Sequence, residues 1–222
     1  MSRRLVPVRR PSAPEGVVVV LHGGASRGEQ VRVSPAQLSV LRMVPVAHRI
    51  AHAGRSRLAV HRLLNSHRGW DSGTTPVADA RWAIDRVRDE HGDVPVAMVG
   101  HSLGGRAALL AGDHPAVTGV VALNPWVLPA DRVDLRGRRV LVVHGTDDRI
   151  ASPSRSADLA RRLAATTSVG YVSLPGAKHA MLRHARAFEA YAADFVTATL
   201  LGTAPRSDAV AAVLAGSTYV ER

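Results

Sequence analysis

Short, continuously apolar runs alternate along the chain with stretches in which apolar residues recur every three or four positions. Continuous apolar runs are typical of strands that helices cover on both faces of a parallel sheet. They predict strands over residues 17–21, 58–64, 94–99, 119–123, 139–143 and 171–174. The periodic stretches predict helices over residues 35–53, 76–91, 103–112, 152–165 and 181–201, and Pro45 should kink or split the first. This alternation predicts an α/β fold, a doubly wound and mostly parallel sheet of about six or seven strands with helices on both faces.

The 222 residues fit one domain with a single large core, and they contain no internal repeat or linker. Residues 1–16 are rich in proline and arginine and are expected to form an irregular N-terminal arm. Residues 203–222 are a C-terminal extension in which Val210, Val213 and Leu214 predict one short helix. We expect its apolar stripe to pack on the domain, and a dimer contact is the alternative.

The composition narrows the chemistry that the chain can perform. It contains no cysteine, which excludes a disulfide framework, a cysteine-ligated metal centre and a thiol nucleophile. The net charge of +11 comes almost entirely from arginine, and no nucleic-acid-binding module or glycine-rich phosphate loop accompanies it. The histidines do not fall at ligand spacings with partner carboxylates, so neither a metal nor a cofactor is expected. No apolar run is long enough to span a membrane and no secretion signal is evident, so we expect a cytoplasmic protein.

The strongest chemical signal is the motif Gly100-His-Ser102-Leu-Gly104, which lies directly between a predicted buried strand and a predicted helix. The glycines remove side chains where strand and helix approach each other, so Ser102 can occupy a sharp turn above the carboxyl edge of the sheet. The helix that begins there directs free N–H groups and its positive dipole end toward a developing oxyanion. Ser102 is therefore the candidate nucleophile.

A nucleophilic serine needs a base and an acid that orients the base. In folds with this serine turn the order along the chain is serine, acid, histidine, so the base must follow the acidic loop at residues 144–150. Only His179 and His184 lie beyond that loop; His179 is in a loop after the last predicted strand, whereas His184 falls in a predicted helix. His179 is therefore the candidate base. Of the two adjacent carboxylates, Asp148 lies further into the loop and is the candidate acid, and Asp147 is expected to bond nearby backbone.

The loop that follows the first apolar strand supplies candidates for the oxyanion hole. Its glycines allow a backbone N–H to face the serine, so the expected donors are the N–H groups of Gly24 and Leu103. His22 is expected only to hold this loop. Three bulky residues in or beside loops near the same edge could line a substrate pocket or simply close the core: Trp70, Trp126 and Met181.

Four segments in sequence order resemble the α/β-hydrolase superfamily: His22-Gly23-Gly24, Gly100-His-Ser102-Leu-Gly104-Gly105, His144-Gly-Thr-Asp-Asp148 and Gly176-Ala-Lys-His179. The resemblance spans about residues 16–200 and is closest to small, lidless members similar to dienelactone hydrolases and carboxylesterases. It implies that Asp148 is the acid. A dienelactone hydrolase proper has a cysteine nucleophile, which this chain lacks. The family's first two strands are missing or reduced to residues 5–8, and residues 120–140 are too few to hold a lid.

The residues and the resemblance together predict a serine hydrolase that cleaves a small ester or thioester through an acyl-enzyme. Acyl transfer or cyclisation on the same residues is an alternative, and so is a non-catalytic binding protein of the same fold. The expected partner is a small-molecule substrate rather than nucleic acid or a membrane, and the chain is expected to be a monomer or homodimer. Because no lid is expected, short acyl groups should be preferred.

Overall fold

The computed structural model describes residues 3–24, 31–69 and 75–221. Within these residues one sheet contains eight strands: β1 (Arg4–Arg9), β2 (Gly16–Leu21), β3 (Leu58–Leu64), β4 (Val96–His101), β5 (Val117–Leu123), β6 (Arg139–Gly145), β7 (Ser168–Leu174) and β8 (Tyr219–Glu221). The helices are α1 (Leu38–Leu41), α2 (Met43–Gly54), α3 (Thr75–His91), α4 (Leu103–Ala111), α5 (Pro153–Leu163), α6 (Ala185–Leu201) and α7 (Asp208–Leu214), with one 3-10 turn, η1 (Leu182–His184).

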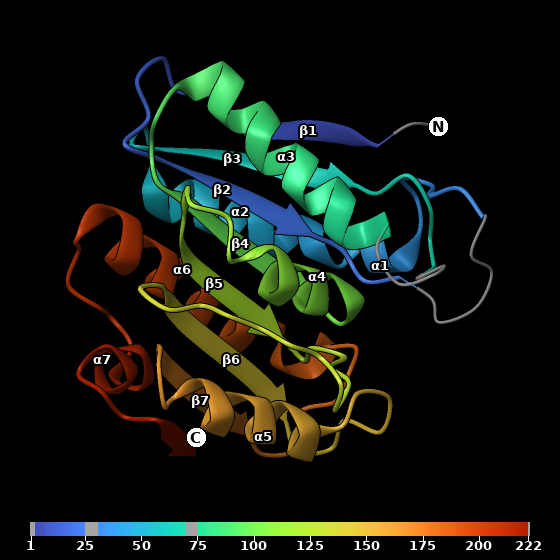
Figure 1. Cartoon of the computed structure of the whole chain (residues 1–222), viewed down its shortest axis with the longest axis vertical. Coiled ribbons are helices and arrows are strands. Elements are labelled where there is room, and N and C mark those ends of the chain that lie inside the picture. The colour runs from blue at the N-terminus through green and yellow to red at the C-terminus, as the bar shows by residue number, and fades with distance from the viewer. Residues whose placement is uncertain (1–2, 25–30, 70–74, 222) are drawn as a thin grey trace.

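The strands lie in the order β1-β3-β2-β4-β5-β6-β7-β8 (Figure 1). Strand β1 runs antiparallel to β3, and every other neighbouring pair is parallel. The predicted doubly wound, mostly parallel α/β sheet is confirmed. Since β2 to β7 all run the same way, their carboxyl ends, and the loops that follow them, meet at one edge of the sheet.

The sheet has eight strands where about six or seven were expected, and the difference lies at its edges. The reduced strand allowed for over residues 5–8 is present within the arm that was expected to be irregular. Arg4–Arg9 form β1, with Leu5 opposite Leu63 and Pro7 opposite His61 of β3. At the other edge Tyr219–Glu221 form β8 beside β7. Neither segment carries a continuous apolar run, because an edge strand has one neighbour and is only partly covered.

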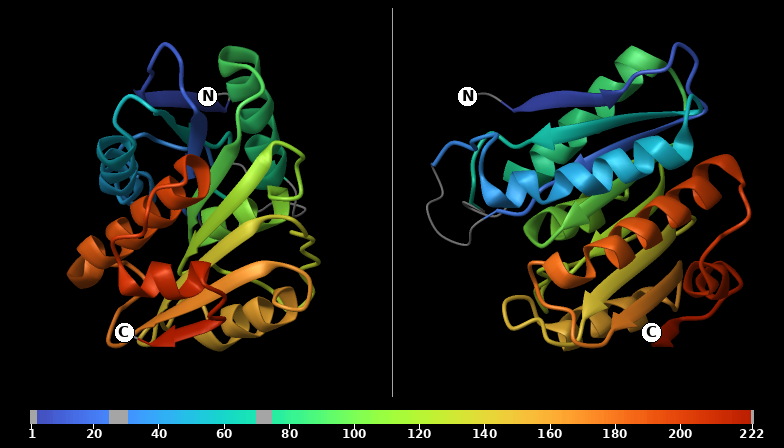
Figure 2. Two further views of the ribbon diagram at one scale, coloured as in Figure 1. Left: turned by 90° about the vertical axis from the view of Figure 1, so that its left-hand side faces the viewer. Right: turned by 180° about the vertical axis from the view of Figure 1, so that it is seen from behind.

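Helices cover both faces of the sheet (Figure 2). The side chains of Val17, Val19 and Leu21 on β2 belong to the core on the face that α3, α4 and α5 cover, with α3 and α4 next to β2. The intervening Val18 and Val20 belong to the core on the other face, which α2, α6 and α7 cover, with α2 and α6 next to β2. A strand buried on both faces has no polar side to alternate with, which explains its unbroken apolar sequence.

The first predicted helix is split, as Pro45 suggested. Helix α1 ends at Leu41 and α2 begins at Met43, so Pro45 lies in the first turn of α2. A proline is tolerated there because the N–H that it lacks would have no partner inside the helix. The break places α1 at the carboxyl edge of the sheet, with Leu38 and Leu41 exposed.

The C-terminal extension packs on its own domain. Ala209, Val210 and Val213 of α7 are buried in the core on the α6 face. The contact with β7 is close, since a Cβ added to Gly170 would lie 2.3 Å from the Val213 side chain. The predicted helix is therefore present, and its apolar stripe is used within the chain.

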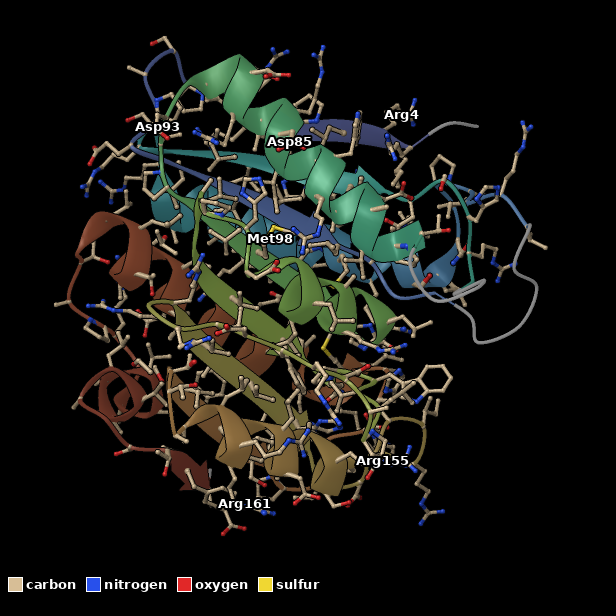
Figure 3. The ribbon with its side chains drawn as sticks, in the orientation of Figure 1. Arg4, Asp85, Asp93, Met98, Arg155 and Arg161 are labelled. Carbon is tan, nitrogen blue, oxygen red and sulfur yellow. The ribbon has the colours of Figure 1, made fainter. Side chains whose placement is uncertain are left out.

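The labelled side chains in Figure 3 illustrate how the sequence divides between core and surface. Met98 lies at the centre of the molecule, whereas Arg4, Arg155 and Arg161 extend from its periphery. Among the residues described, no helix combines the length and apolar character needed to cross a membrane.

Candidate active site

Ser102 lies in a strained turn between β4 and α4. Its backbone has φ 56° and ψ −122°, in a region that costs a non-glycine residue about 1–3 kcal/mol. The flanking glycines allow this close approach of strand and helix. A Cβ on Gly100 would lie 2.2 Å from the carbonyl oxygen of Gly104, and a Cβ on Gly104 would lie 2.4 Å from that of His22. Glycine is therefore required on both sides of the serine.

His179 lies between Ser102 and Asp148, on the loop that follows β7. Its Nε2 is 2.9 Å from Ser102 Oγ, and its Nδ1 is 2.7 Å from Asp148 Oδ2. An ionised carboxylate only accepts hydrogen bonds, so Nδ1 carries the proton and the Nε2 lone pair faces the serine hydroxyl. This is the tautomer that a general base needs.

The side chain of Asp148 is fully buried and faces four polar groups, two backbone N–H groups and two histidine rings. Oδ1 accepts the N–H groups of Ile150 and Ala151 at 2.8 and 2.9 Å. Oδ2 faces His179 Nδ1 and, at 3.2 Å, His144 Nε2. Burial alone would raise the pKa of Asp148, but the hydrogen bonds from His144, His179 and the Ile150 N–H outweigh it and hold the pKa well below its usual range. The group is therefore an anion at neutral pH.

Asp147 does not reach His179. It is exposed, and its Oδ1 accepts the hydroxyl of Thr146 at 3.3 Å. The structure thus brings Ser102, His179 and Asp148 together and leaves Asp147 in the turn.

The loop after β2 lies against the first residue of α4. A Cβ on Gly24 would be 3.2 Å from the Leu103 side chain and 2.2 Å from the carbonyl oxygen of Arg68. The Leu103 N–H is at the first position of α4, where it has no partner within the helix. His22 holds the loop: its Nδ1 lies 2.6 Å from the Gly23 carbonyl oxygen, and its Nε2 accepts the Asn65 N–H at 3.2 Å.

A family model described as serine aminopeptidase, S33, matches residues 12–140, which include Gly24 and Ser102 but end before Asp148 and His179. The chain belongs to this family. The S33 family lies within the α/β-hydrolase superfamily, so the resemblance seen in the four sequence segments is confirmed. No curated protein sequence matches the chain.

Solved structures similar to this S33-family chain share its fold at low sequence identity. Protein ATU1826 of unknown function from Agrobacterium tumefaciens has 18% identity and a TM-score of 0.70 over 92% of this chain and 94% of its own. XC6422 from Xanthomonas campestris, a serine hydrolase without a lid, has 19% identity and a TM-score of 0.64 over 86% and 85%. Est1E from Butyrivibrio proteoclasticus with bound ferulic acid has 15% identity and a TM-score of 0.67 over 90% and 96%.

The three pocket candidates have different surroundings in this S33-family fold. Trp70 lies outside the described residues. The Trp126 side chain is half-buried against the core on the α4 face, and the backbone N–H of Trp126 donates to the Ser102 carbonyl oxygen at 3.1 Å. Met181 is buried, with a left-handed φ of 61°, and lines an apolar cavity of about 290 Å³ next to the His179 loop. Its other walls include Leu38, Leu41, Ala180 and Phe188.

A second, polar recess of about 570 Å³ opens beside Gly24. Arg32, Arg42 and Arg68 contribute to its wall, together with Ser34 and Gln37. Among the residues described, no carboxylate lines this recess or forms an ion pair with those three arginines. Three arginines thus lie at the approach to the Gly24 loop.

Two further polar residues hold the loop of His179, and sequence reasoning gave them no role. Asn124 donates from Nδ2 to the carbonyl oxygens of Lys178 and His179, both at 3.2 Å, and its Oδ1 accepts the Gly145 N–H at 2.9 Å. His101 Nε2 lies 2.9 Å from the His179 carbonyl oxygen. Burial, with the neighbouring His179, lowers the pKa of His101 to about 3, so it is neutral. Both residues are polar and lie where a buried strand ends, and this pattern in the sequence could have identified them.

Sequence reasoning also missed His144, although it lies in a quoted motif. The ring is completely buried at the end of β6, with its Nε2 3.2 Å from Asp148 Oδ2 and its Nδ1 2.7 Å from Ser156 Oγ.

A cluster of histidines and a carboxylate lies away from this site. The expectation that no histidines fall at ligand spacing with a carboxylate is wrong there, because the ligand atoms of His61, Glu90 and His91 lie together.

Proposed function

We propose that this chain is a serine hydrolase that cleaves a small ester or thioester through an acyl-enzyme, with Ser102 as nucleophile, His179 as base and Asp148 as orienting acid. The observation that carries the proposal is the unbroken path from Ser102 Oγ to His179 Nε2 at 2.9 Å and from His179 Nδ1 to Asp148 Oδ2 at 2.7 Å. The S33 family match agrees with this chemical class.

In the first half-reaction Ser102 Oγ attacks the substrate carbonyl while its proton passes to His179 Nε2. The imidazolium that forms is stabilised by the Asp148 anion. As the tetrahedral intermediate collapses, His179 gives this proton to the leaving alcohol or thiol. Water then attacks the acyl-enzyme with His179 again as base, and the acid product leaves Ser102 free.

The negative charge that develops on the carbonyl oxygen needs donors fixed before the reaction begins. The N–H groups of Gly24 and Leu103 are the proposed donors, supported by the close contact between the Gly24 loop and α4. The positive recess formed by Arg32, Arg42 and Arg68 lies beside them. It favours a substrate that carries an anionic group.

The apolar cavity beside Met181 is the proposed acyl site. Its volume of about 290 Å³ is at the small end of ligand pockets, which span roughly 300–1,000 Å³. The segment between β5 and β6 contains no helix or strand that could act as a lid. Each methylene left in water forgoes about 0.8 kcal/mol, so the preferred acyl groups have two to four carbons, roughly, and activity does not rise at lipid interfaces.

Fluorophosphonate labelling followed by peptide mass analysis tests the nucleophile. Wild type should be labelled on the peptide containing Ser102. Ser102→Ala should not be labelled, and it should lose turnover on p-nitrophenyl butyrate by ~10³-fold or more. A folded wild type that resists labelling, or a labelled Ser102→Ala variant, contradicts the proposal and favours a binding protein.

A series of p-nitrophenyl esters tests the substrate. Rates should peak at short acyl chains, and a short diacid monoester should have a lower KM than the neutral ester of equal length. Arg42→Met should remove that difference and leave kcat on the neutral ester unchanged. A peak at long chains would exclude the small acyl site, and product trapped by an added alcohol instead of water would indicate acyl transfer.

A further inference from the structure

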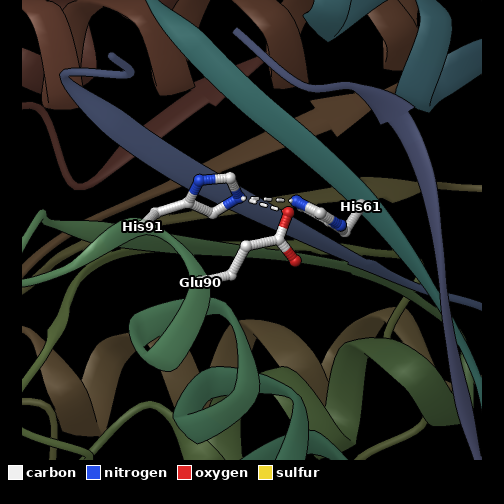
Figure 4. A group of neighbouring side chains, drawn as sticks. All are labelled: His61, Glu90 and His91. Carbon is white, nitrogen blue, oxygen red and sulfur yellow. Dashed lines mark hydrogen bonds and ion pairs between the residues drawn. The ribbon is translucent and has the colours of Figure 1, made fainter. Parts of the chain in front are cut away.

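Two histidines and a glutamate meet on the α3 side of the sheet, away from Ser102 (Figure 4). His61 is on β3 and buried, while Glu90 and His91 are the last two residues of α3. His61 Nε2 lies 3.0 Å from His91 Nε2, and His91 Nε2 lies 3.4 Å from Glu90 Oε1. All three ligand atoms are within 4.8 Å of one another.

The distances between these atoms fit a shared metal ion. A zinc ion bound tetrahedrally at about 2.0–2.1 Å holds its donor atoms roughly 3.3 Å apart. The separations of 3.0 Å between the two histidine Nε2 atoms and 3.4 Å between His91 Nε2 and Glu90 Oε1 fall on either side of that value. Two imidazole nitrogens and one carboxylate oxygen are also a donor set that zinc accepts, and a fourth position remains for water.

The hydrogen bond between the two rings already brings both Nε2 atoms to one point, where an ion could replace the shared proton. In the metal-free state one Nε2–H joins the two rings by a hydrogen bond. Moving that proton to the Nδ1 of the same ring directs both Nε2 lone pairs at the ion, and no proton leaves the pair.

The cluster is shielded but reachable from solvent. The His91 side chain is 6% exposed and that of Glu90 31%, so an ion could enter from the Glu90 side. Arg10, just after β1, bonds Glu90 Oε1 at 2.6 Å and is itself exposed. A partner outside the ligand shell commonly orients a ligating carboxylate in this way, although the charge of Arg10 also opposes a cation.

We propose that His61, Glu90 and His91 bind one divalent transition-metal ion, with zinc the best match to their donors and spacing. The site is separate from the proposed active site. His61 on β3 pairs with Val19 on β2, which pairs with Met98 on β4, so the cluster lies two strands away from β4, and Met98 is four residues before Ser102. A bound ion would join β3 to the end of α3 and, through Arg10, to the chain after β1, so its role is to stabilise this edge of the fold.

Calorimetric titration of the full chain with zinc chloride, after dialysis against EDTA, tests the site. Wild type should bind zinc tightly, with a Kd in the micromolar range or lower. At a concentration of about 100 times Kd, zinc should raise Tm by roughly 5–10 °C. His91→Ala should weaken this binding by ~100-fold or more, since loss of a partner outside the ligand shell alone costs about 10–100-fold.

Glu90→Gln is the second variant. It keeps the size of the side chain at the helix end and should also weaken binding and reduce the Tm shift. His48→Ala is the matched control, because His48 is an exposed histidine on α2 and its loss should change neither quantity. The proposal is overturned if wild type binds zinc with a Kd weaker than ~100 µM. It is also overturned if folded His91→Ala and Glu90→Gln bind zinc with the affinity of wild type.

Discussion

The two carboxylate oxygens of Asp148 have different partners. Backbone N–H groups donate to Oδ1, and two histidine rings face Oδ2. Ile150 and Ala151 fix Oδ1, so the side chain cannot rotate without losing both bonds. Oδ2 is divided between His179, which faces Ser102, and His144, which faces the core. Orientation of the proposed base thus depends on residues that never approach a substrate.

We expect Asp148→Asn to retain the fold and lose most activity, with kcat falling by about 10³–10⁴-fold, because the amide no longer fixes the base tautomer. Asp147→Asn should change kcat less than about threefold. Steady-state kinetics on one activated ester compares the two, with circular dichroism to show that both are folded. The reverse ranking would identify Asp147 as the acid.

His144→Phe tests whether the buried histidine positions the acid. Phenylalanine fills the space of the ring but offers no polar atom to Asp148 Oδ2, so the carboxylate should hold His179 less firmly. We therefore expect kcat to fall while KM changes little. His184→Phe, outside this network, should change neither constant. An unchanged kcat in a folded His144→Phe variant would mean that His144 only fills space.

At the scale of elements, the serine turn depends on how closely α4 approaches β2 and β4. Gly104 lies against the Leu21 and His22 carbonyl oxygens, and backbone cannot move aside as a flexible side chain can. The next residue, Gly105, has more room: an added Cβ would be 3.1 Å from its nearest neighbours.

Gly104→Ala should consequently be destabilising. Overpacking of this kind costs typically about 1–3 kcal/mol, which lowers Tm by roughly 2–12 °C for a chain of this size. Gly105→Ala should lower Tm much less, since alanine is also the better helix former by about 1 kcal/mol. Thermal unfolding of the two variants provides the comparison, and equal Tm values would show that α4 can shift away from β2.

The elements that sequence predicts best are those with a strong local pattern. Leu58–Leu64 is predicted with its bounds, because five of its seven residues are apolar and the strand is buried along most of its length. β8 was missed, and β1 was expected only as a reduced strand over residues 5–8, since pairing with a neighbour, not their own composition, makes both segments strands. In the same way, local motifs and their order along the chain led to Ser102, Asp148 and His179. The contacts of Asn124 and His144 arise only when distant loops meet at the sheet edge. The roles of all these residues stay predictions until activity is measured.

For the whole molecule, buried neutral histidines make stability depend on pH. Burial lowers the pKa of His101 to about 3 and of His61 to about 4, and it also lowers that of His22. In the unfolded chain these rings titrate near 6.5. Between those values the unfolded state binds more protons than the folded state, so stability must fall as the pH decreases.

Tm should therefore be level above about pH 7 and decline steadily from about pH 6.5 toward pH 4. His101→Gln removes one of the titrating rings and should make the decline shallower, measured by thermal unfolding in buffers of constant ionic strength. A Tm that is constant from pH 7.5 to about 4.5 would show that these rings are accessible to protons in the folded state.

The two outer strands also determine how the sheet meets its surroundings. β1 contains Pro7, which has no N–H to donate, its pairing is interrupted between Pro7 and Arg9, and it carries arginine at both ends. β8 is only three residues long. A row of unpaired backbone groups invites another chain to add a strand, and proline, charge, irregular pairing and shortness each discourage it. A sheet this apolar therefore ends on both sides in strands whose features discourage a second chain from extending it.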